Sequence, residues 1–281
     1  MTKSKKNSAI NANNAEKVRE FYNQNTENFI EVYGEIIQAF RTTNVNDYLD
    51  YTIKSTNLKT GERALDAGCG VCGPAIYFAN KIANLHIDAC TISDDQAEKG
   101  KSNIDKNNLS GAIRVIRSDY HNIADVYGNG QFDIVYFLES FGHSTQKNVL
   151  IDACWDVLKP GGRLYIKDLF KRISEDEWEQ LRINQICSDI EIGYEYDIAN
   201  LSSVLDKIRS KGFILNFVKV PEVDLSQFEQ LTISNDFQNL FDIAKIKSWD
   251  DYVFPIDFFE ILAIKPAVSN LDNMHLYFMN K

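Results

Sequence analysis

The sequence predicts an α/β fold in which a mainly parallel sheet is covered on both faces by helices. Short apolar segments alternate with helical segments from residue 63 onward. Turns rich in glycine and proline, at residues 128–130 and 159–162, separate these units. Repeated alternation of this kind requires right-handed crossovers, which make the connected strands parallel. The length of 281 residues, with 44% apolar residues, is enough for one good core.

The apolar pattern places each element in turn. Seven strands are predicted, at 63–67, 86–92, 113–117, 132–138, 162–169, 213–220 and 258–264. Helices are predicted at 74–82, 94–107, 147–158, 174–192 and 198–211, with Gly212 ending the last one. Helical spacing of apolar residues between 16 and 40 predicts one or two further helices. The expected organisation is a disordered tail at 1–14, a helical cap at 15–60 and the main domain at 61–281, with a helical lid inserted around 174–200.

Charge and composition exclude several classes of protein. The net charge of −10 and the pI near 5.0 argue against a nucleic-acid-binding protein, which needs a basic face. The polar residues 1–14 match neither a secretory signal nor a membrane anchor, and no run reaches the ~18–20 apolar residues of a spanning helix. We therefore expect a cytoplasmic protein that acts on a small molecule, and a homo-oligomer remains compatible with the sequence.

Five cysteines, an odd number without a framework spacing, indicate reduced and mostly buried thiols. Cys69 and Cys72 form a C-x-x-C pair at an expected helix start, where redox chemistry is the alternative interpretation. A second pair that would complete a zinc site is missing from the sequence, so no metal is predicted there.

The segment from Ala64 to Gly73 is the most informative in the chain. An apolar strand runs into Gly68, Gly70 and Gly73, whose spacing lets the backbone turn sharply and lets a ligand approach the start of the next helix. Asp66 lies at the mouth of this turn, where a carboxylate would repel a pyrophosphate but suit a cationic amino-acid group. S-adenosylmethionine (SAM) is such a ligand, because it carries a sulfonium and an α-ammonium and no phosphate.

The order of several separated motifs resembles that of the class I SAM-dependent methyltransferases. The first motif is Leu65-Asp66-Ala67-Gly68-Cys69-Gly70, the fourth strand begins Phe132-Asp133-Ile134-Val135, and Leu158-Lys159-Pro160-Gly161-Gly162 follows it. The resemblance covers about residues 18–264 and implies their Rossmann-like fold and SAM as cofactor. A nicotinamide-binding Rossmann domain is the rival, but its fingerprint lacks the acid at Asp66 and the Leu-Lys-Pro-Gly-Gly turn.

The second strand departs from the common family pattern. Thr91 occupies the place of the usual ribose-binding acid, and the stretch Thr91-Ile92-Ser93-Asp94-Asp95-Gln96 resembles carbon methyltransferases of the cyclopropane-synthase, sterol, tocopherol and prenyl-diphosphate group. The resemblance implies that Thr91, Ile92 and Gln96 lie at the ribose. The structural alternative is that Ser93 only caps the following helix.

The resemblance also implies the remaining cofactor residues. Asp119 and Tyr120, after the third strand, are expected beside the adenine, and a surface-loop acid is the alternative for Asp119. Tyr22 or Tyr33, in the N-terminal cap, is expected to bond the SAM carboxylate while its ring closes the pocket, or simply to pack.

Glu139 and His143 follow the fourth strand, at the edge where parallel sheets bind their substrates. They match in position the Glu and the downstream His of the carbon methyltransferases, and Glu139 is also expected to line the cofactor pocket. If the acceptor is an alkene, a carboxylate here can stabilise a carbocation and then take a proton. If it is a hydroxyl, the same two residues can act as a general base pair. A capping Glu and a structural His are the alternatives.

Aromatic residues of the variable region are the expected substrate walls, chiefly Trp178, Tyr194, Tyr196 and Trp249. Core packing is the alternative for this aromatic density. A prenyl diphosphate would need phosphate partners, for which Lys167, Lys171 and Arg172 are available, and Mg²⁺ is expected only in that case.

The sequence thus predicts a SAM-dependent methyltransferase of a small apolar metabolite, with carbon methylation of an isoprenoid, such as a prenyl diphosphate, as the leading subclass. An O- or N-methyltransferase of a natural product is the close alternative. A nucleotide-dependent oxidoreductase and a non-catalytic SAM-binding module are the alternatives of another class.

Overall fold

The computed structural model describes residues 2–36, 42, 44–222 and 253–268 of the chain, with side chains described from Asn14 onward. The seven strands are β1 (Arg63–Ala67), β2 (His86–Thr91), β3 (Ile113–Arg117), β4 (Phe132–Leu138), β5 (Leu158–Lys171), β6 (Ile214–Lys219) and β7 (Ile256–Ile264). The α-helices are α1 (Thr2–Tyr33), α2 (Val45–Thr56), α3 (Gly73–Lys81), α4 (Asp94–Lys106), α5 (Ile123–Tyr127), α6 (Lys147–Val157), α7 (Glu177–Tyr194) and α8 (Leu201–Lys211). Two short 3₁₀ turns, η2 (Tyr120–Asn122) and η3 (Phe141–His143), follow β3 and β4.

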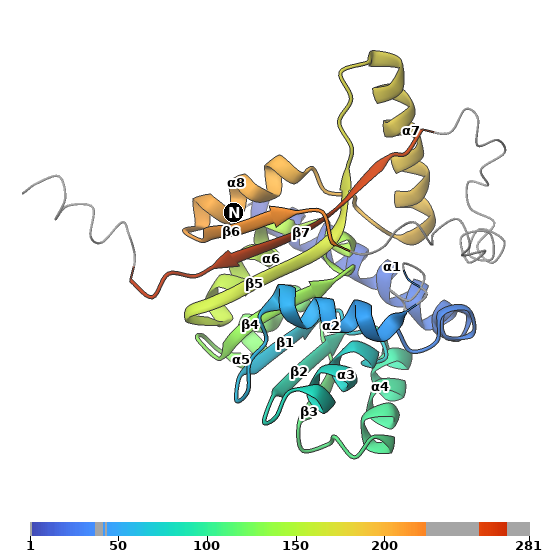
Figure 1. The fold of residues 1–281 in the computed structure, drawn as a ribbon. Coiled ribbons are helices and arrows are strands. Elements are labelled where there is room, and N and C mark those ends of the chain that lie inside the picture. The colour runs from blue at the N-terminus through green and yellow to red at the C-terminus, as the bar shows by residue number, and fades with distance from the viewer. Residues whose placement is uncertain (1, 37–41, 43, 223–252, 269–281) are drawn as a thin grey trace, which may run out of the picture.

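The strands form one sheet in the order β3-β2-β1-β4-β5-β7-β6 (Figure 1). The pairs from β3 to β5 are parallel, whereas β7 pairs antiparallel with both β5 and β6. The prediction of a mainly parallel, seven-stranded sheet is therefore confirmed. The order in which successive strands are added to the sheet reverses between β1 and β4, which makes the carboxyl ends of these two parallel strands the natural ligand crevice.

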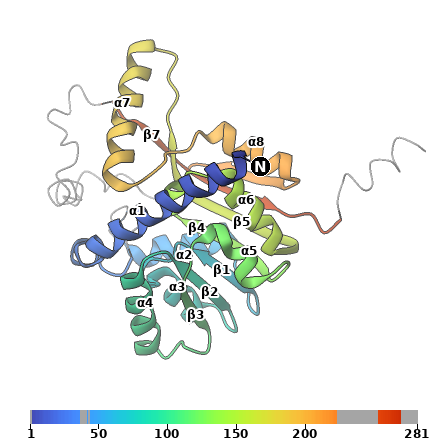
Figure 2. The same ribbon diagram turned by 180° about the vertical axis from the view of Figure 1, so that it is seen from behind.

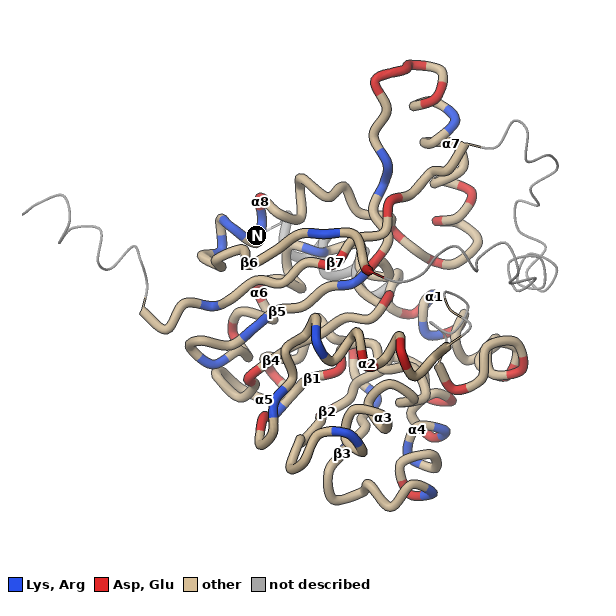
Figure 3. The backbone as a smooth tube through the Cα atoms, viewed as in Figure 1, with Lys and Arg blue, Asp and Glu red and all other residues tan. Residues whose placement is uncertain are grey.

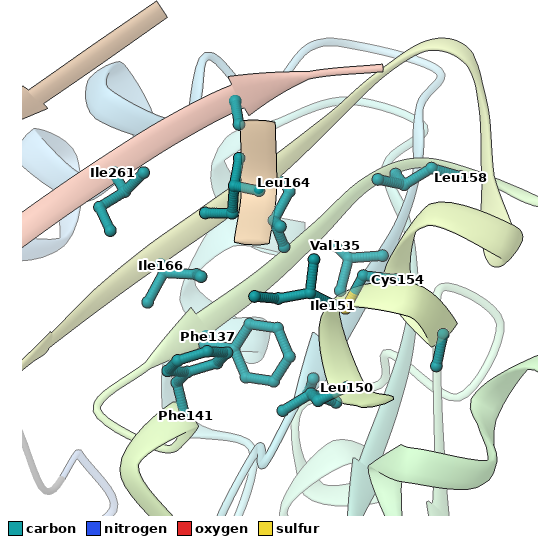
Figure 4. Close-up of a cluster of buried hydrophobic side chains, with 14 of the residues drawn as sticks. Val135, Phe137, Phe141, Leu150, Ile151, Cys154, Leu158, Leu164, Ile166 and Ile261 are labelled. Carbon is teal, nitrogen blue, oxygen red and sulfur yellow. The ribbon is translucent and has the colours of Figure 1, made fainter. Parts of the chain in front are cut away.

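Each face of the sheet buries its own apolar cluster. One cluster joins alternate residues of the strands to α5, α6 and α8, and Figure 4 shows its centre, where Phe137 and Phe141 meet edge to face with ring centroids 5.4 Å apart. The other cluster joins the opposite strand faces to α2, α3 and α4. Because successive residues of a strand point to opposite faces, the Asp66 side chain faces the α2–α4 layer between Leu65 and Ala67, which face the other one.

Helix α1 crosses the molecule from the start of α6 to α4, as the rear view shows (Figure 2). Asn14 accepts a hydrogen bond from Thr145 at one end, and Glu27 pairs with Lys99 of α4 at the other. α4 carries both acidic and basic residues along its length (Figure 3). The helix α1 begins at Thr2, inside the segment expected to be a disordered tail. The expected domain boundaries remain a prediction.

Helix α7 stands away from the sheet beyond the end of β5 (Figure 1). Trp178, one of the expected substrate walls, is 62% exposed on this helix, and Leu181 is 69% exposed. Ile183 and Cys187 form the buried face of the helix instead. In the part of the chain that the structure describes, no helix has both the length and the apolarity needed to cross a membrane.

Candidate active site

A cavity opens at the carboxyl ends of β1, β2 and β4, beneath α1, with about 940 Å³ of empty space including its open mouth. Residues predicted from the sequence line it from every side: Tyr22, Asp66, Gly68, Gly70, Thr91, Ile92, Gln96, Asp119, Tyr120, Glu139 and His143. Segments spread over more than 120 positions of the chain thus meet at one site.

The glycine turn is shaped by contacts within the protein. The amide groups of Gly68 and Cys69 both donate to the carbonyl of Cys90, which ties the turn to β2. Gly68 has φ of 89°, and a Cβ atom there would lie 2.4 Å from Cβ of Ser140. The Ser140 hydroxyl in turn donates to the Ala67 carbonyl. The glycine therefore allows the loops after β1 and β4 to approach each other.

Asp66 lines the cavity and is only 2% exposed. Its Oδ2 atom has no hydrogen-bond partner among the described residues. Burial raises the pKa of Asp66 to about 7, and the nearby Tyr136 hydroxyl offsets part of that shift by favouring the carboxylate. A buried carboxylate oxygen without a partner is costly for the protein alone, and it suits a ligand that brings a cation or an N–H donor.

Thr91 and Gln96 meet in the cavity as a buried pair. The Thr91 hydroxyl donates to Oε1 of Gln96 over 2.7 Å. Ser93 caps α4 by accepting the Gln96 backbone amide, and its own hydroxyl donates to Asn23 of α1. The helix-capping role of Ser93 is confirmed, and Thr91 and Gln96 are left facing the cavity together.

Asp119 is held by a neighbouring histidine. Its Oδ1 atom accepts the backbone amide of His121 and lies 2.6 Å from Nδ1 of the same residue. Burial acts to raise the pKa of Asp119, but the His121 contacts outweigh burial and hold the pKa below its usual value. Tyr120 donates to the Ser140 carbonyl over 3.1 Å. Both residues therefore reach the cavity in fixed positions.

Glu139 follows β4 in an unusual backbone conformation. Its φ of 59° lies in the left-handed region, which is uncommon for a residue with a side chain and often marks a functional site. Its amide donates to the Lys167 carbonyl over 2.8 Å, and Phe141, packed in the core two residues later, holds the rest of the loop. The Glu139 carboxylate accepts a long hydrogen bond of 3.5 Å from Tyr48 of α2.

His143 is fixed in one tautomer by partners from distant segments. Nδ1 lies 3.0 Å from the carbonyl of Glu195 and must donate to it, because a carbonyl only accepts. Nε2 then accepts from the Tyr22 hydroxyl over 2.7 Å. Burial lowers the pKa of His143 to about 4, and the Glu195 carbonyl offsets part of the shift. The imidazole is therefore neutral at physiological pH.

Asp168 is a residue that sequence reasoning missed. It lies near the end of β5, is 1% exposed, and accepts the Gly142 amide and the Tyr196 hydroxyl. Burial raises the pKa of Asp168 to about 6, and the Glu139 charge adds to the rise. The hydrogen bonds that Asp168 accepts act in the opposite direction and lower the pKa. The rule that singled out Glu139, a polar residue at the carboxyl end of a parallel strand, could also have found Asp168.

The other expected residues are spread more widely. Tyr196 packs edge to face on His143, with ring centroids 4.6 Å apart, and Tyr194 lies near Phe21 of α1. Tyr33 packs on Phe29 rather than lining the cavity. Trp178 lies on the exposed side of α7, away from the cavity lining. Trp249 lies outside the described residues.

The Cys69–Cys72 pair is buried, and the part of the chain with described side chains holds no candidate metal site. Cys69 and Cys72 are buried thiols with sulfur atoms 3.7 Å apart, and the Cys72 contact together with burial raises the pKa of Cys69 well above its usual value. Among residues whose positions are described, no group of three or more His, Cys, Asp or Glu side chains could hold a metal ion.

Comparison with known proteins finds similar methyltransferases. Residues 64–162 match the family model of a methyltransferase domain. The sterol 24-C-methyltransferase ERG6A of Gibberella zeae is 26% identical over 215 residues, which are 73% of this chain and 55% of that protein. Residues 64–162 are therefore a methyltransferase domain, and the chain resembles the class I SAM-dependent methyltransferases. It spans about half the length of this curated relative.

Two solved structures share the methyltransferase fold. The [4+2]-cyclase SpnF has a TM-score of 0.72 at 20% identity, covering 89% of this chain and 96% of its own. The geranyl diphosphate C-methyltransferase of Streptomyces coelicolor, solved with Mg²⁺, geranyl diphosphate and S-adenosyl-L-homocysteine, has a TM-score of 0.62 at 14% identity, covering 79% of each chain. At these identities the likeness concerns the fold alone.

Proposed function

We propose that this methyltransferase moves a methyl group from SAM to a small apolar acceptor. The observation that carries the proposal is the cavity itself, in which the unpartnered Oδ2 of Asp66 and the carboxylate of Glu139 line the same space. Bound SAM supplies an activated methyl group on a sulfonium. The protein has to align donor and acceptor and exclude water, and a cavity covered by α1 suits both tasks.

The residues present fit the cofactor. Asp66 would hold the α-ammonium, because it lines the cavity and its Oδ2 atom has no hydrogen-bond partner among the described residues. Thr91 and Gln96 would bond the ribose hydroxyls, with Ile92 against the nucleoside, and Asp119 and Tyr120 would flank the adenine. Of the two tyrosines considered for the carboxylate, only Tyr22 lines the cavity, so we assign this role to Tyr22, whose hydroxyl would then turn from Nε2 of His143 to the cofactor.

Carbon methylation of an isoprenoid is the leading proposal for the acceptor. Methylation of an alkene leaves positive charge on the acceptor, and Glu139 offers a carboxylate that stabilises this charge and then takes a proton. The ring of Tyr22, which lines the cavity, adds an aromatic group that favours a cation.

A diphosphate on that isoprenoid receives less support from the described cations. Lys167 is fully buried and donates to Thr52, and Arg172 pairs with Glu179. Lys171, the third expected cation, is half-buried at the end of β5, and none of the three is among the cavity-lining residues, so a neutral isoprenoid fits the described site better than a prenyl diphosphate. Mg²⁺ belongs only to the diphosphate version of the proposal.

Methylation of a hydroxyl or an amine is the second candidate, and the tautomer of His143 favours it. A general base needs an unprotonated nitrogen, which Nε2 of His143 provides, but burial lowers the pKa of His143 to about 4, so it is a weak base, and it would first have to release the Tyr22 hydroxyl. In this version His143 would accept the acceptor proton.

Two measurements test the proposal. Titration calorimetry with SAM and with NAD is expected to show binding of SAM only, and NAD binding without SAM binding would favour an oxidoreductase. Incubation with labelled SAM and a panel of neutral terpenes, prenyl diphosphates, phenols and amines is expected to yield a methylated product. SAM binding with no product from any class would favour a non-catalytic binding module.

Two substitutions test the roles assigned. Asp66→Ala should weaken SAM binding by roughly tenfold or more, since a charge-assisted contact is lost. Glu139→Gln should keep SAM affinity and lose most turnover, with the exposed Glu98→Gln on α4 as control. Unchanged turnover in Glu139→Gln would remove Glu139 from the chemistry.

A further inference from the structure

Helix α2 places a tyrosine between a buried cation and the carboxylate of Glu139. Tyr48 is 2% exposed, and its hydroxyl is 3.5 Å from Oε1 of Glu139. On the other side, Nζ of Lys167 lies over the Tyr48 ring, 4.0 Å from its centroid. One phenol therefore touches the ammonium with its face and the carboxylate with its hydroxyl.

The ammonium of Lys167 is built into the fold. Lys167 is 0% exposed, and Nζ donates to the Thr52 hydroxyl over 2.8 Å, one helical turn after Tyr48. The Thr52 hydroxyl itself donates to the Tyr48 carbonyl. Burying a lysine is costly, so a lysine held at this position is a candidate for a role beyond packing.

The backbone places Glu139 against the same residue. The Glu139 amide donates to the Lys167 carbonyl, and its φ of 59° takes the side chain out of the alternation of β4. Glu139 is thereby held by β5 through its main chain and by α2 through its side chain.

We propose that Tyr48 is a positioning residue for Glu139 and that Lys167 acts through it. The positive charge beneath the ring polarises the phenol and makes its hydroxyl a better donor, and the donated hydrogen bond orients and stabilises the charged form of Glu139. The contact is long, and catalytic hydrogen bonds often tighten only when the substrate complex forms. The catalytic consequence rests on the proposed function, whereas the effect on Glu139 does not.

Other groups also act on Glu139 and set the background for a test. Asp168 of β5 interacts with it as a like charge, and Tyr22 of α1 and Tyr196, after α7, lie within its electrostatic range. His143, in the η3 turn, is neutral at physiological pH, and Asp66 of β1 lines the same cavity. These groups stay in place when Tyr48 alone is changed.

The test measures the carboxyl group directly, with no acceptor needed. Protein labelled with ¹³C at the Glu side-chain carboxyl carbon is titrated by NMR, and the Glu139 signal is assigned by its loss in Glu139→Gln. Tyr48→Phe keeps the ring over Lys167 and removes only the hydroxyl. We expect the Glu139 titration to move to higher pH, because the charged form loses a donor.

Tyr51→Phe is the matched control, because the Tyr51 hydroxyl, on the same helix, donates to Glu260 instead. It should leave the Glu139 titration unchanged. Lys167→Met should raise the pKa of Glu139 more in the wild type than in Tyr48→Phe. Equal shifts in both backgrounds would show that Lys167 does not act through Tyr48.

An unchanged Glu139 titration in a folded Tyr48→Phe protein would overturn the positioning role, whatever the protein does with SAM. Product analysis with labelled SAM judges the proposed function separately. A shifted titration in a protein that yields no methylated product would keep the positioning role and remove its catalytic consequence.

Discussion

The Tyr22 hydroxyl lies 2.7 Å from Nε2 of His143 and joins helix α1 to the loop after β4. With Nδ1 committed to the Glu195 carbonyl, the imidazole has a donor on one side and an acceptor on the other. Three segments far apart in the chain therefore fix the protonation state of one ring beside the cavity.

His143 is expected to stay neutral down to about pH 4, the value to which burial lowers its pKa. The unfolded imidazole protonates near pH 6.5. Because the folded pKa is the lower one, His143 contributes stability above about pH 6.5 that is lost as the pH falls toward 4. NMR of the ring, assigned with His143→Gln, checks this, and an inflection near pH 6.5 in the folded protein would contradict it.

SAM binding at pH 6 is expected to release a proton from Asp66. The free carboxyl has a raised pKa of about 7, so it is mostly protonated at pH 6, and a cationic ligand favours the charged form. Calorimetry in buffers of different ionisation enthalpy measures the release, which should fade by pH 8. Asp66→Asn should abolish it and the exposed Asp125→Asn should not. The same release in both variants would show that another group titrates.

Gly142→Ala is expected to destabilise the protein by on the order of 1–3 kcal/mol through overpacking. A Cβ atom at Gly142 would lie 2.0 Å from the ring of Tyr196, which would have to leave its contacts with Asp168 and His143. Gly111→Ala is the matched control, because a Cβ atom there meets nothing within 4 Å. Urea unfolding compares the two, and equal midpoints would mean that Tyr196 moves at no cost.

The thiols are expected to react slowly in the native protein. All five cysteines are buried and unpaired, and burial raises the pKa of Cys90 to about 12 and of Cys187 to about 11. Since the thiolate is the reactive form, a disulfide reagent at pH 8 should label the unfolded chain much faster than the native one. Rapid labelling of Cys69 or Cys72 in the native state would revive a redox role for the C-x-x-C pair.

Much of the fold could be predicted because local patterns of apolar and turn residues indicate it. The strands 63–67, 113–117 and 132–138 coincide with β1, β3 and β4, since short apolar runs between turn residues leave few alternatives. The sequence did not predict α2 as a separate helix within the expected cap. The expected turn at 159–162 lies within the bounds of β5. On α7 the apolar residues do not follow one face, so the sequence alone does not indicate which of them are exposed.

The sequence by itself determined the order of the motifs along the chain, the glycine turn and the two carboxylates, Asp66 and Glu139, because each depends on a few neighbouring residues. Only the tertiary structure decided what these groups contact. Tyr22 with His143, Tyr48 with Glu139 and Tyr196 with Asp168 are pairs separated by 121, 91 and 28 positions. Such pairs form only when α1, α2 and the turn after α7 fold back over the edge of the sheet, and no local periodicity encodes that return.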